Sequence, residues 1–126
     1  MTRILFVCVE NSCRSQMAEA FARQQGRDAH SAGSRPSGIV SPRAIESMGE
    51  SGYDLATHRS KSLDEIPAGP YAAAITMGCG DACPFVDAEL REDWEIPDPK
   101  TMPREEFRRV RDEIERRVHD LLERLG

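Results

Sequence analysis

The chain has 126 residues, of which 39% are hydrophobic and 31% charged, with a formal net charge of −5 at pH 7. These values fit a folded chain with a single domain over residues 1–126 and exclude a disordered one. The acidic balance, without a cluster of basic and aromatic residues, argues against nucleic-acid binding. The apolar run over residues 4–9 is too short to span a bilayer and has no signal-peptide cleavage site, so we expect a cytoplasmic protein that does not bind membranes.

Strands and helices are expected to alternate along the chain. Residues 3–9 are apolar and of the β-forming type, and they predict a buried strand. Residues 15–25 place apolar side chains at helical spacing and end at Gly26, which predicts a helix. The pattern then predicts a strand over 29–32, followed by a helix from Pro42 to about Ser51 with Ser41 as N-cap. A small helix is expected near 61–66, a strand over 71–77 and a fourth short strand around Trp94 and Ile96. The C-terminal segment predicts an amphipathic helix with an apolar stripe from Phe107 to Leu125.

This alternation predicts an α/β fold, with a four-stranded parallel sheet flanked by helices on both faces. Ligands of such sheets bind beyond the carboxyl ends of the strands. Two cysteine pairs follow predicted strands there: Cys8 with Cys13, and Cys79 with Cys83. A reducing compartment disfavours structural disulfides, so catalytic, redox or metal-binding roles are the alternatives for these thiols.

The loop over residues 8–15 joins a predicted strand to a predicted helix. Its backbone N–H groups and the positive end of the helix favour an anion, and Arg14 adds a planar pair of donors for two oxygens. The same field favours a thiolate at Cys8, to which Ser15 can donate a hydrogen bond. A Cys-x5-Arg loop is typical of thiol phosphatases, although Cys8 could instead be a buried strand residue. We expect the loop residues Glu10, Asn11, Ser12, Cys13, Arg14 and Ser15 to bind the oxyanion, with Asn11 bracing the loop and the Cys13 side chain serving structure.

Residues 8–20, CVENSCRSQMAEA, resemble the arsenate reductases of the thioredoxin-coupled type, which are built on the low-molecular-weight tyrosine phosphatase fold. The likeness continues through residues 31–33, 41–46, 58–60, the second cysteine pair, Trp94, Asp98-Pro99 and residues 107–114. It implies that fold and the reduction of arsenate to arsenite in arsenic detoxification. It also implies thioredoxin as the electron donor, no metal or other cofactor, and a chain that acts as a monomer.

The resemblance assigns the second cysteine pair to a thiol relay. Cys8 would attack arsenate, Cys79 would then attack Cys8, and Cys83 would attack Cys79. Gly78 and Gly80 flank Cys79 and favour the backbone movement that such a relay needs. Zinc binding and inert packing are the alternatives, although two cysteines supply only half of a zinc site. The three residues between Cys79 and Cys83 are fewer than in the best-known branch of the family.

The resemblance also makes Asp98, between two prolines, the general acid that protonates the leaving oxygen. A turn-forming aspartate is the alternative. Some relatives bind potassium behind the loop with counterparts of Asn11, Glu19, Ser31 and an acidic residue, and that acidic position is Lys61 here. We hypothesise that the Lys61 ammonium takes the place of the ion and pairs with Glu19.

Two other functions stay open at this point. The first is a phosphatase of the same fold that hydrolyses aryl phosphates, in which water resolves the Cys8 adduct. The second is a non-enzymatic thiol sensor or metal-binding regulator, which would leave the Cys-x5-Arg loop and Asp98 without a role.

Overall fold

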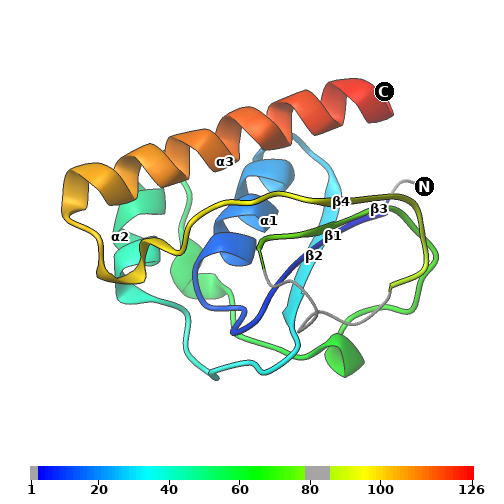
Figure 1. The fold of residues 1–126 in the computed structure, drawn as a ribbon, viewed down its shortest axis with the longest axis horizontal. Coiled ribbons are helices and arrows are strands. Elements are labelled where there is room, and N and C mark those ends of the chain that lie inside the picture. The colour runs from blue at the N-terminus through cyan, green and yellow to red at the C-terminus, as the bar shows by residue number, and fades with distance from the viewer. Residues whose placement is uncertain (1–2, 79–85) are drawn as a thin grey trace.

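The computed structural model describes residues 3–78 and 86–126. Its sheet has the strand order β2-β1-β3-β4, and all neighbouring strands are parallel. The strands are β1 (Arg3–Cys8), β2 (Asp28–Gly33), β3 (Tyr71–Thr76) and β4 (Ala88–Asp93). The helices are α1 (Arg14–Gln24), α2 (Pro42–Glu50) and α3 (Arg104–Leu125), with short 3₁₀ helices η1 (Leu55–Thr57), η2 (Leu63–Glu65) and η4 (Pro99–Thr101). The predicted α/β fold with a four-stranded parallel sheet is confirmed (Figure 1).

The two faces of the sheet are covered differently. Ile4, Phe6 and Cys8 on one face of β1 belong to a core that also holds the buried residues of α1, α2 and α3. Leu5 and Val7 on the other face pack in a smaller cluster with residues in and beside η2. Among residues 3–78 and 86–126, the expected helices on both faces are therefore the three α-helices on one side and the 3₁₀ turn η2 on the other. Figure 1 shows this green turn apart from α1, α2 and α3.

The fourth strand lies earlier in the chain than predicted. β4 ends at Asp93, and Trp94 and Ile96 follow it. Side chains of β4 alternate between half-buried and exposed, because β4 lies at the edge of the sheet. The apolar signal came from the residues just after the strand: Trp94 is buried, with its ring centroid 6.0 Å from that of Phe6. Burial in the core explains the apolar character of these two residues, although the Trp94 N–H still donates to the Thr76 carbonyl at the end of β3.

The predicted helix boundaries are close to those observed. Ser41 caps α2, with its Oγ accepting from the Ala44 N–H, and Pro42 occupies the first turn. The apolar stripe of α3 is buried from Phe107 to Leu122. No helix of the described residues is long and apolar enough to cross a membrane. The predicted loop over residues 78–84, with Cys79 and Cys83, lies outside the described residues except for Gly78.

Candidate active site

Cys8 ends β1 and lies beside the first turn of α1. Its Sγ is 2.9 Å from the Ser15 Oγ, and both residues are buried. The Asn11 Nδ2 donates to the same Ser15 oxygen over 2.9 Å. The Ser15 oxygen accepts from Asn11 through one lone pair and keeps its own hydrogen, which it can donate to a Cys8 thiolate. The predicted contact between Ser15 and Cys8 is thus present, and donation from Ser15 would stabilise a thiolate at Cys8.

Asn11 holds the loop from inside. Its φ of 49° lies in the left-handed region, which asparagine tolerates better than most residues. The Asn11 Oδ1 accepts from the Gln16 Nε2 and from the Lys61 N–H, each over 2.9 Å. Together with the donation to Ser15, these bonds tie the loop to α1 and to the segment before η2. Asn11 therefore braces the loop, as the sequence predicted.

The loop also packs closely on the end of β2. A Cβ on Gly33 would lie 2.6 Å from the Val9 carbonyl oxygen and 2.9 Å from the Asn11 nitrogen, so no larger residue fits there. The carbonyl of Glu10 accepts from the Ser37 N–H over 3.0 Å and from the Ser60 Oγ over 2.9 Å. These contacts fix the loop backbone.

Arg14 is anchored through one nitrogen. Its Nη1 donates to the carbonyl oxygens of Met77, over 2.6 Å, and Ile96, over 2.8 Å. Within the part of the chain that the structure describes, its Nε and Nη2 have no partner. A guanidinium held in this way keeps two parallel N–H donors for an oxyanion, which is the bidentate geometry that arginine favours.

A cavity of about 440 Å³ opens at the carboxyl end of the sheet. It brings together the three predicted catalytic residues that the structure describes, Cys8, Arg14 and Asp98. Asn11 and Ser15 lie buried behind the loop and do not line the cavity. The other lining residues are Val9, Glu10, Ser12 and Cys13 of the loop, Ser37, Ile39, Ser41 and Pro42 before and at the start of α2, and Lys100.

The two loop cysteines differ in environment. Burial, together with the nearby charges of Asp98 and Cys8, raises the pKa of Cys13 to about 12. Cys13 therefore stays a thiol at neutral pH, which agrees with its interpretation as a structural residue. Cys8 is the cysteine with the Ser15 donor, so it is the candidate nucleophile.

Asp98 begins the segment over residues 98–102, which contains η4. Its Oδ1 accepts from the Lys100 N–H over 3.0 Å, and the following residue, Pro99, is buried. The Lys100 Nζ lies 3.5 Å from the Glu10 Oε1, so an exposed ion pair joins this segment to the loop. Asp98 is thus an exposed carboxylate on the wall of the cavity that Cys8 and Arg14 also line.

A hydrogen-bonded chain behind the loop was not predicted. The His58 Nδ1 lies 2.9 Å from the Gln16 Oε1, and its Nε2 lies 2.6 Å from the Tyr53 hydroxyl. Burial lowers the pKa of His58, so the neutral ring donates through Nδ1 to Gln16 and accepts at Nε2 from Tyr53. The Gln16 Nε2 in turn donates to the Asn11 Oδ1, so the chain of hydrogen bonds continues to the loop. The sequence signal that could have revealed these hydrogen bonds is Gln16, a polar residue at the start of a helix whose other side chains are largely apolar.

The Lys61 ammonium lies beside Glu19 and Ser31, as expected if it takes the place of a potassium ion. Its Nζ is 3.5 Å from the Glu19 Oε1 and 3.3 Å from the Ser31 Oγ, which confirms the expected pairing with Glu19. Arg23 Nη2 holds the second oxygen of Glu19 at 2.8 Å. Burial lowers the pKa of Lys61, and the Glu19 carboxylate opposes that effect. An ammonium among these oxygens would repel a potassium ion, so these residues do not fit the cation.

The described residues show no metal centre. Among residues 3–78 and 86–126, no three histidine, cysteine or acidic side chains gather to hold a metal ion.

Known proteins share the fold and much of the sequence of this chain. Residues 3–126 match the low molecular weight phosphotyrosine protein phosphatase family. The glutaredoxin arsenate reductase of a Synechocystis species is 38% identical, with 100% of both chains covered. A solved arsenate reductase in a phosphate-binding state is 38% identical over 100% of both chains, with a TM-score of 0.90. The thioredoxin-dependent arsenate reductase Cg_ArsC1' of Corynebacterium glutamicum is 29% identical, with a TM-score of 0.77 over 99% of this chain and 62% of that one. The chain belongs to the low molecular weight phosphotyrosine protein phosphatase family and, within it, groups with the arsenate reductases.

Proposed function

We propose that this chain reduces arsenate to arsenite with electrons from thioredoxin, and that it serves arsenic detoxification in the cytoplasm as a monomer. The observation that carries the proposal is the cavity shared by Cys8, Arg14 and Asp98, in a chain 38% identical to an arsenate reductase along its whole length. Arsenate is a tetrahedral oxyanion, which matches the donors of the loop and the free edge of Arg14.

The first step forms a bond between Cys8 and arsenic. The Cys8 thiolate attacks arsenate held by the loop amides and by Arg14, and an As–O bond breaks. Asp98 gives its proton to the departing oxygen, which leaves as water. The hydrogen bond from Ser15 stabilises the thiolate before the attack, and the anchoring of Arg14 through Nη1 keeps its other donors on the oxyanion.

The next steps move two electrons from thiols to arsenic. The Cys79 thiolate attacks the Cys8 sulfur, and the electron pair of the S–As bond stays on arsenic, which leaves as arsenite. Cys83 then attacks Cys79 and frees Cys8 as a thiolate. The order of attack rests on the sequence and the family resemblance, since Cys79 and Cys83 lie outside the described residues. The reaction as written needs no metal or nucleotide.

The electron donor is tested by coupling the enzyme to NADPH. With thioredoxin and its reductase, we expect arsenate-dependent NADPH consumption that glutathione and glutaredoxin do not match. The thioredoxin-dependent reductase of C. glutamicum supports this choice, while the Synechocystis relative is named for glutaredoxin. Faster turnover with the glutathione system would overturn the thioredoxin assignment and leave arsenate reduction in place.

The relay is tested with Cys83→Ser. This variant should stop after about one turnover and accumulate a Cys8–Cys79 disulfide, which peptide mass spectrometry after thiol blocking detects. Continued cycling with thioredoxin would contradict the relay.

Hydrolysis of aryl phosphates is a second candidate, favoured by the phosphatase family match. Phosphate and arsenate share shape and charge, so we expect weak phosphatase activity beside arsenate reduction. Cys79→Ser separates the two, because it removes the thiol that resolves the arsenic adduct and leaves water to resolve a phosphocysteine. A variant that hydrolyses p-nitrophenyl phosphate normally but reduces no arsenate fits the proposal. A wild-type chain that hydrolyses phosphate efficiently and never reduces arsenate would make the phosphatase the primary function.

A further inference from the structure

One arginine of α2 reaches the segment that carries Asp98. The Arg43 Nη1 donates to the carbonyl oxygens of Lys100, over 2.8 Å, and Pro99, over 3.4 Å, and its Nη2 donates to that of Met102. The Arg43 guanidinium carbon also lies 4.8 Å from the centre of the Phe107 ring, at the start of α3. A single side chain thus joins α2, the 98–102 segment and α3.

The 98–102 segment has few other connections. Its remaining described hydrogen bonds are internal, from the Lys100 N–H to Asp98 and from the Met102 N–H to the Pro99 carbonyl. Apart from Arg43, the polar contact described between this segment and the rest of the chain is the exposed ion pair of Lys100 with Glu10. Exposed ion pairs of this kind contribute little to stability, because solvent screens the two charges. Apolar packing also holds the segment, since Pro99 is buried and Met102 packs against the main core. Among the polar contacts, its position on the cavity wall depends mainly on Arg43.

We propose that Arg43 is a positioning residue that sets the Asp98 carboxylate against the oxyanion site. This inference rests on the proposed function, in which Asp98 is the proton donor. Proton transfer requires hydrogen-bond distance to the leaving oxygen, so a segment that moves by an ångström loses rate while the oxyanion still binds. Arg43 acts through the segment and does not line the cavity of Cys8.

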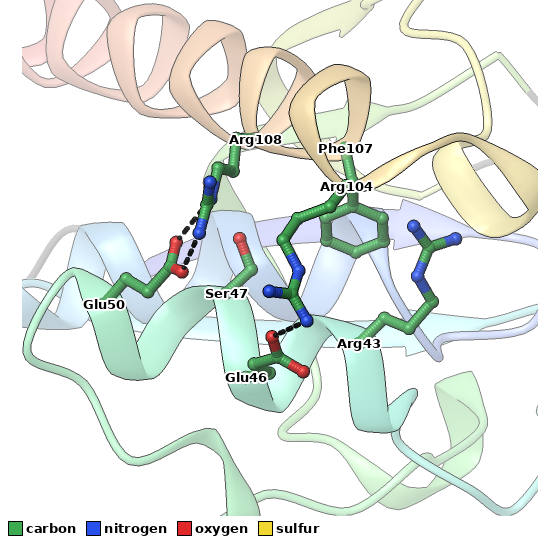
Figure 2. Close-up of a pocket in the computed structure, with 7 residues that line it drawn as sticks. All are labelled: Arg43, Glu46, Ser47, Glu50, Arg104, Phe107 and Arg108. Atoms are coloured by element: carbon green, nitrogen blue, oxygen red, sulfur yellow. Dashed lines mark hydrogen bonds and ion pairs between the residues drawn. The ribbon is translucent and has the colours of Figure 1, made fainter.

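The neighbouring arginines have a different role, which makes them a matched control. Figure 2 shows the pocket between α2 and α3, in which Arg104 faces Glu46 and Arg108 faces Glu50. These pairs connect α2 with α3 directly. Arg108 donates to both Glu50 oxygens, and it makes no described bond to the 98–102 segment. Loss of Arg108 removes an α2–α3 contact and leaves the bonds of Arg43 to the segment intact.

Arginine suits this position for a physical reason. Three carbonyl oxygens accept from its two terminal nitrogens, while its planar group stacks on an aromatic face. Arg43→Met keeps the aliphatic stem and removes all of these donors. Arg43→Lys keeps the charge and a single donor nitrogen, and it serves as the milder variant if Met lowers the melting temperature.

The test is single-turnover arsenate reduction by the fully reduced, full-length protein without thioredoxin. We expect Arg43→Met to lower the rate constant at saturating arsenate by about tenfold, which is a part of the roughly 10²–10⁴-fold that general acid catalysis contributes. Half-saturation by arsenate should stay near the wild-type value, because Arg14 and the loop amides are unchanged. Arg108→Met should match the wild type. In the Asp98→Asn background, Arg43→Met should cause no further loss, since both changes remove the same step.

A second measurement, amide hydrogen exchange, does not depend on arsenate reduction. Amide hydrogen exchange over residues 98–102 should be faster in Arg43→Met than in the wild type and in Arg108→Met. Unchanged exchange, an equal loss of rate in Arg108→Met, or a full further loss in the Asp98→Asn background would each overturn the positioning role. A wild-type chain that never reduces arsenate would defeat the proposed function, and exchange alone would then decide whether Arg43 holds the segment.

Discussion

The oxyanion loop and the 98–102 segment line the same cavity, yet they are held in different ways. The loop is fixed from inside by several side chains, since Asn11, Gln16 and Ser60 contribute bonds to its backbone or to each other. The hydrogen bonds that join the 98–102 segment to the rest of the described chain come from Arg43, beside the apolar packing of Pro99 and Met102. We infer that oxyanion binding is built redundantly into the fold, whereas placement of the proton donor depends on few contacts and is easier to perturb.

Arg14→Lys should have the largest effect, because Arg14 supplies two of the donors that the oxyanion loop offers to the substrate. Lysine cannot keep the bonds to the Met77 and Ile96 carbonyls and also present two parallel donors to the oxyanion. We expect kcat/KM for arsenate to fall by about 10²–10³-fold, as for loss of an oxyanion donor. Arg59→Lys, at an exposed ion pair with Glu65, is the control in the same steady-state assay. A loss below threefold would show that Arg14 does not hold the substrate.

Asp98→Asn should remove the proton donor and spare the fold. The asparagine oxygen can still accept from the Lys100 N–H, so the melting temperature should stay close to that of the wild type. We expect the rate of arsenate reduction to fall by about 10²-fold, within the range of general acid catalysis. Rate measurements across pH, paired with thermal unfolding, check both halves. An unchanged rate would assign Asp98 to the turn alone.

Asn11→Gly should lower the stability of the fold, whereas Asp98→Asn should lower the rate and spare the fold. Glycine accepts the φ of 49°, so the backbone is unstrained, but the bonds to Ser15, Gln16 and Lys61 are lost. Buried groups without partners cost about 1–3 kcal/mol, and we expect the free energy of unfolding to fall by this amount. Denaturant unfolding measures it. A variant as stable as the wild type would mean that the loop is held without Asn11.

The sequence predicted the parts of the site that lie close together in the chain. Cys8, Arg14 and Ser15 fall between a strand and a helix, so their meeting at one anion site follows from local geometry. The family resemblance added Asp98, and the cavity brings it to the same place.

The long-range supports could not be predicted in the same way. Arg43 meets residues 99–102 only through the packing of α2 beside α3, and His58 meets Gln16 only after η1 folds against α1. Neither contact has a local pattern, because each depends on where separate elements pack. The misplaced fourth strand has a related cause: Trp94 is apolar because it fills the core, and not because it pairs in the sheet.

His58 should make stability depend on pH through the loop supports. Burial lowers the pKa of His58 below its ordinary 6.5, so below about that pH the unfolded chain binds a proton that the folded chain resists. Stability should therefore fall as pH drops from neutral through 6.5 towards the lower, folded pKa. Glu19, Arg23 and Lys61 are the charged groups around the ring. His58→Gln, compared with the wild type by thermal unfolding at several pH values, should flatten this dependence. An equally steep decline in the variant would assign the effect to other groups.

The smallest expected effect concerns potassium. The Lys61 ammonium lies among the Glu19 and Ser31 oxygens, so no cation is needed to neutralise Glu19 behind the loop. Replacing sodium by potassium at constant ionic strength should leave both arsenate reduction and the melting temperature unchanged, because a ligand that does not bind the folded state cannot stabilise it. Lys61→Asp is the informative variant, since it removes the ammonium and adds a carboxylate beside Glu19, and its melting temperature should rise when potassium replaces sodium. A clear rise in the wild type would contradict the role of Lys61, and it would mean that the loop is braced by a bound ion and not by the chain alone.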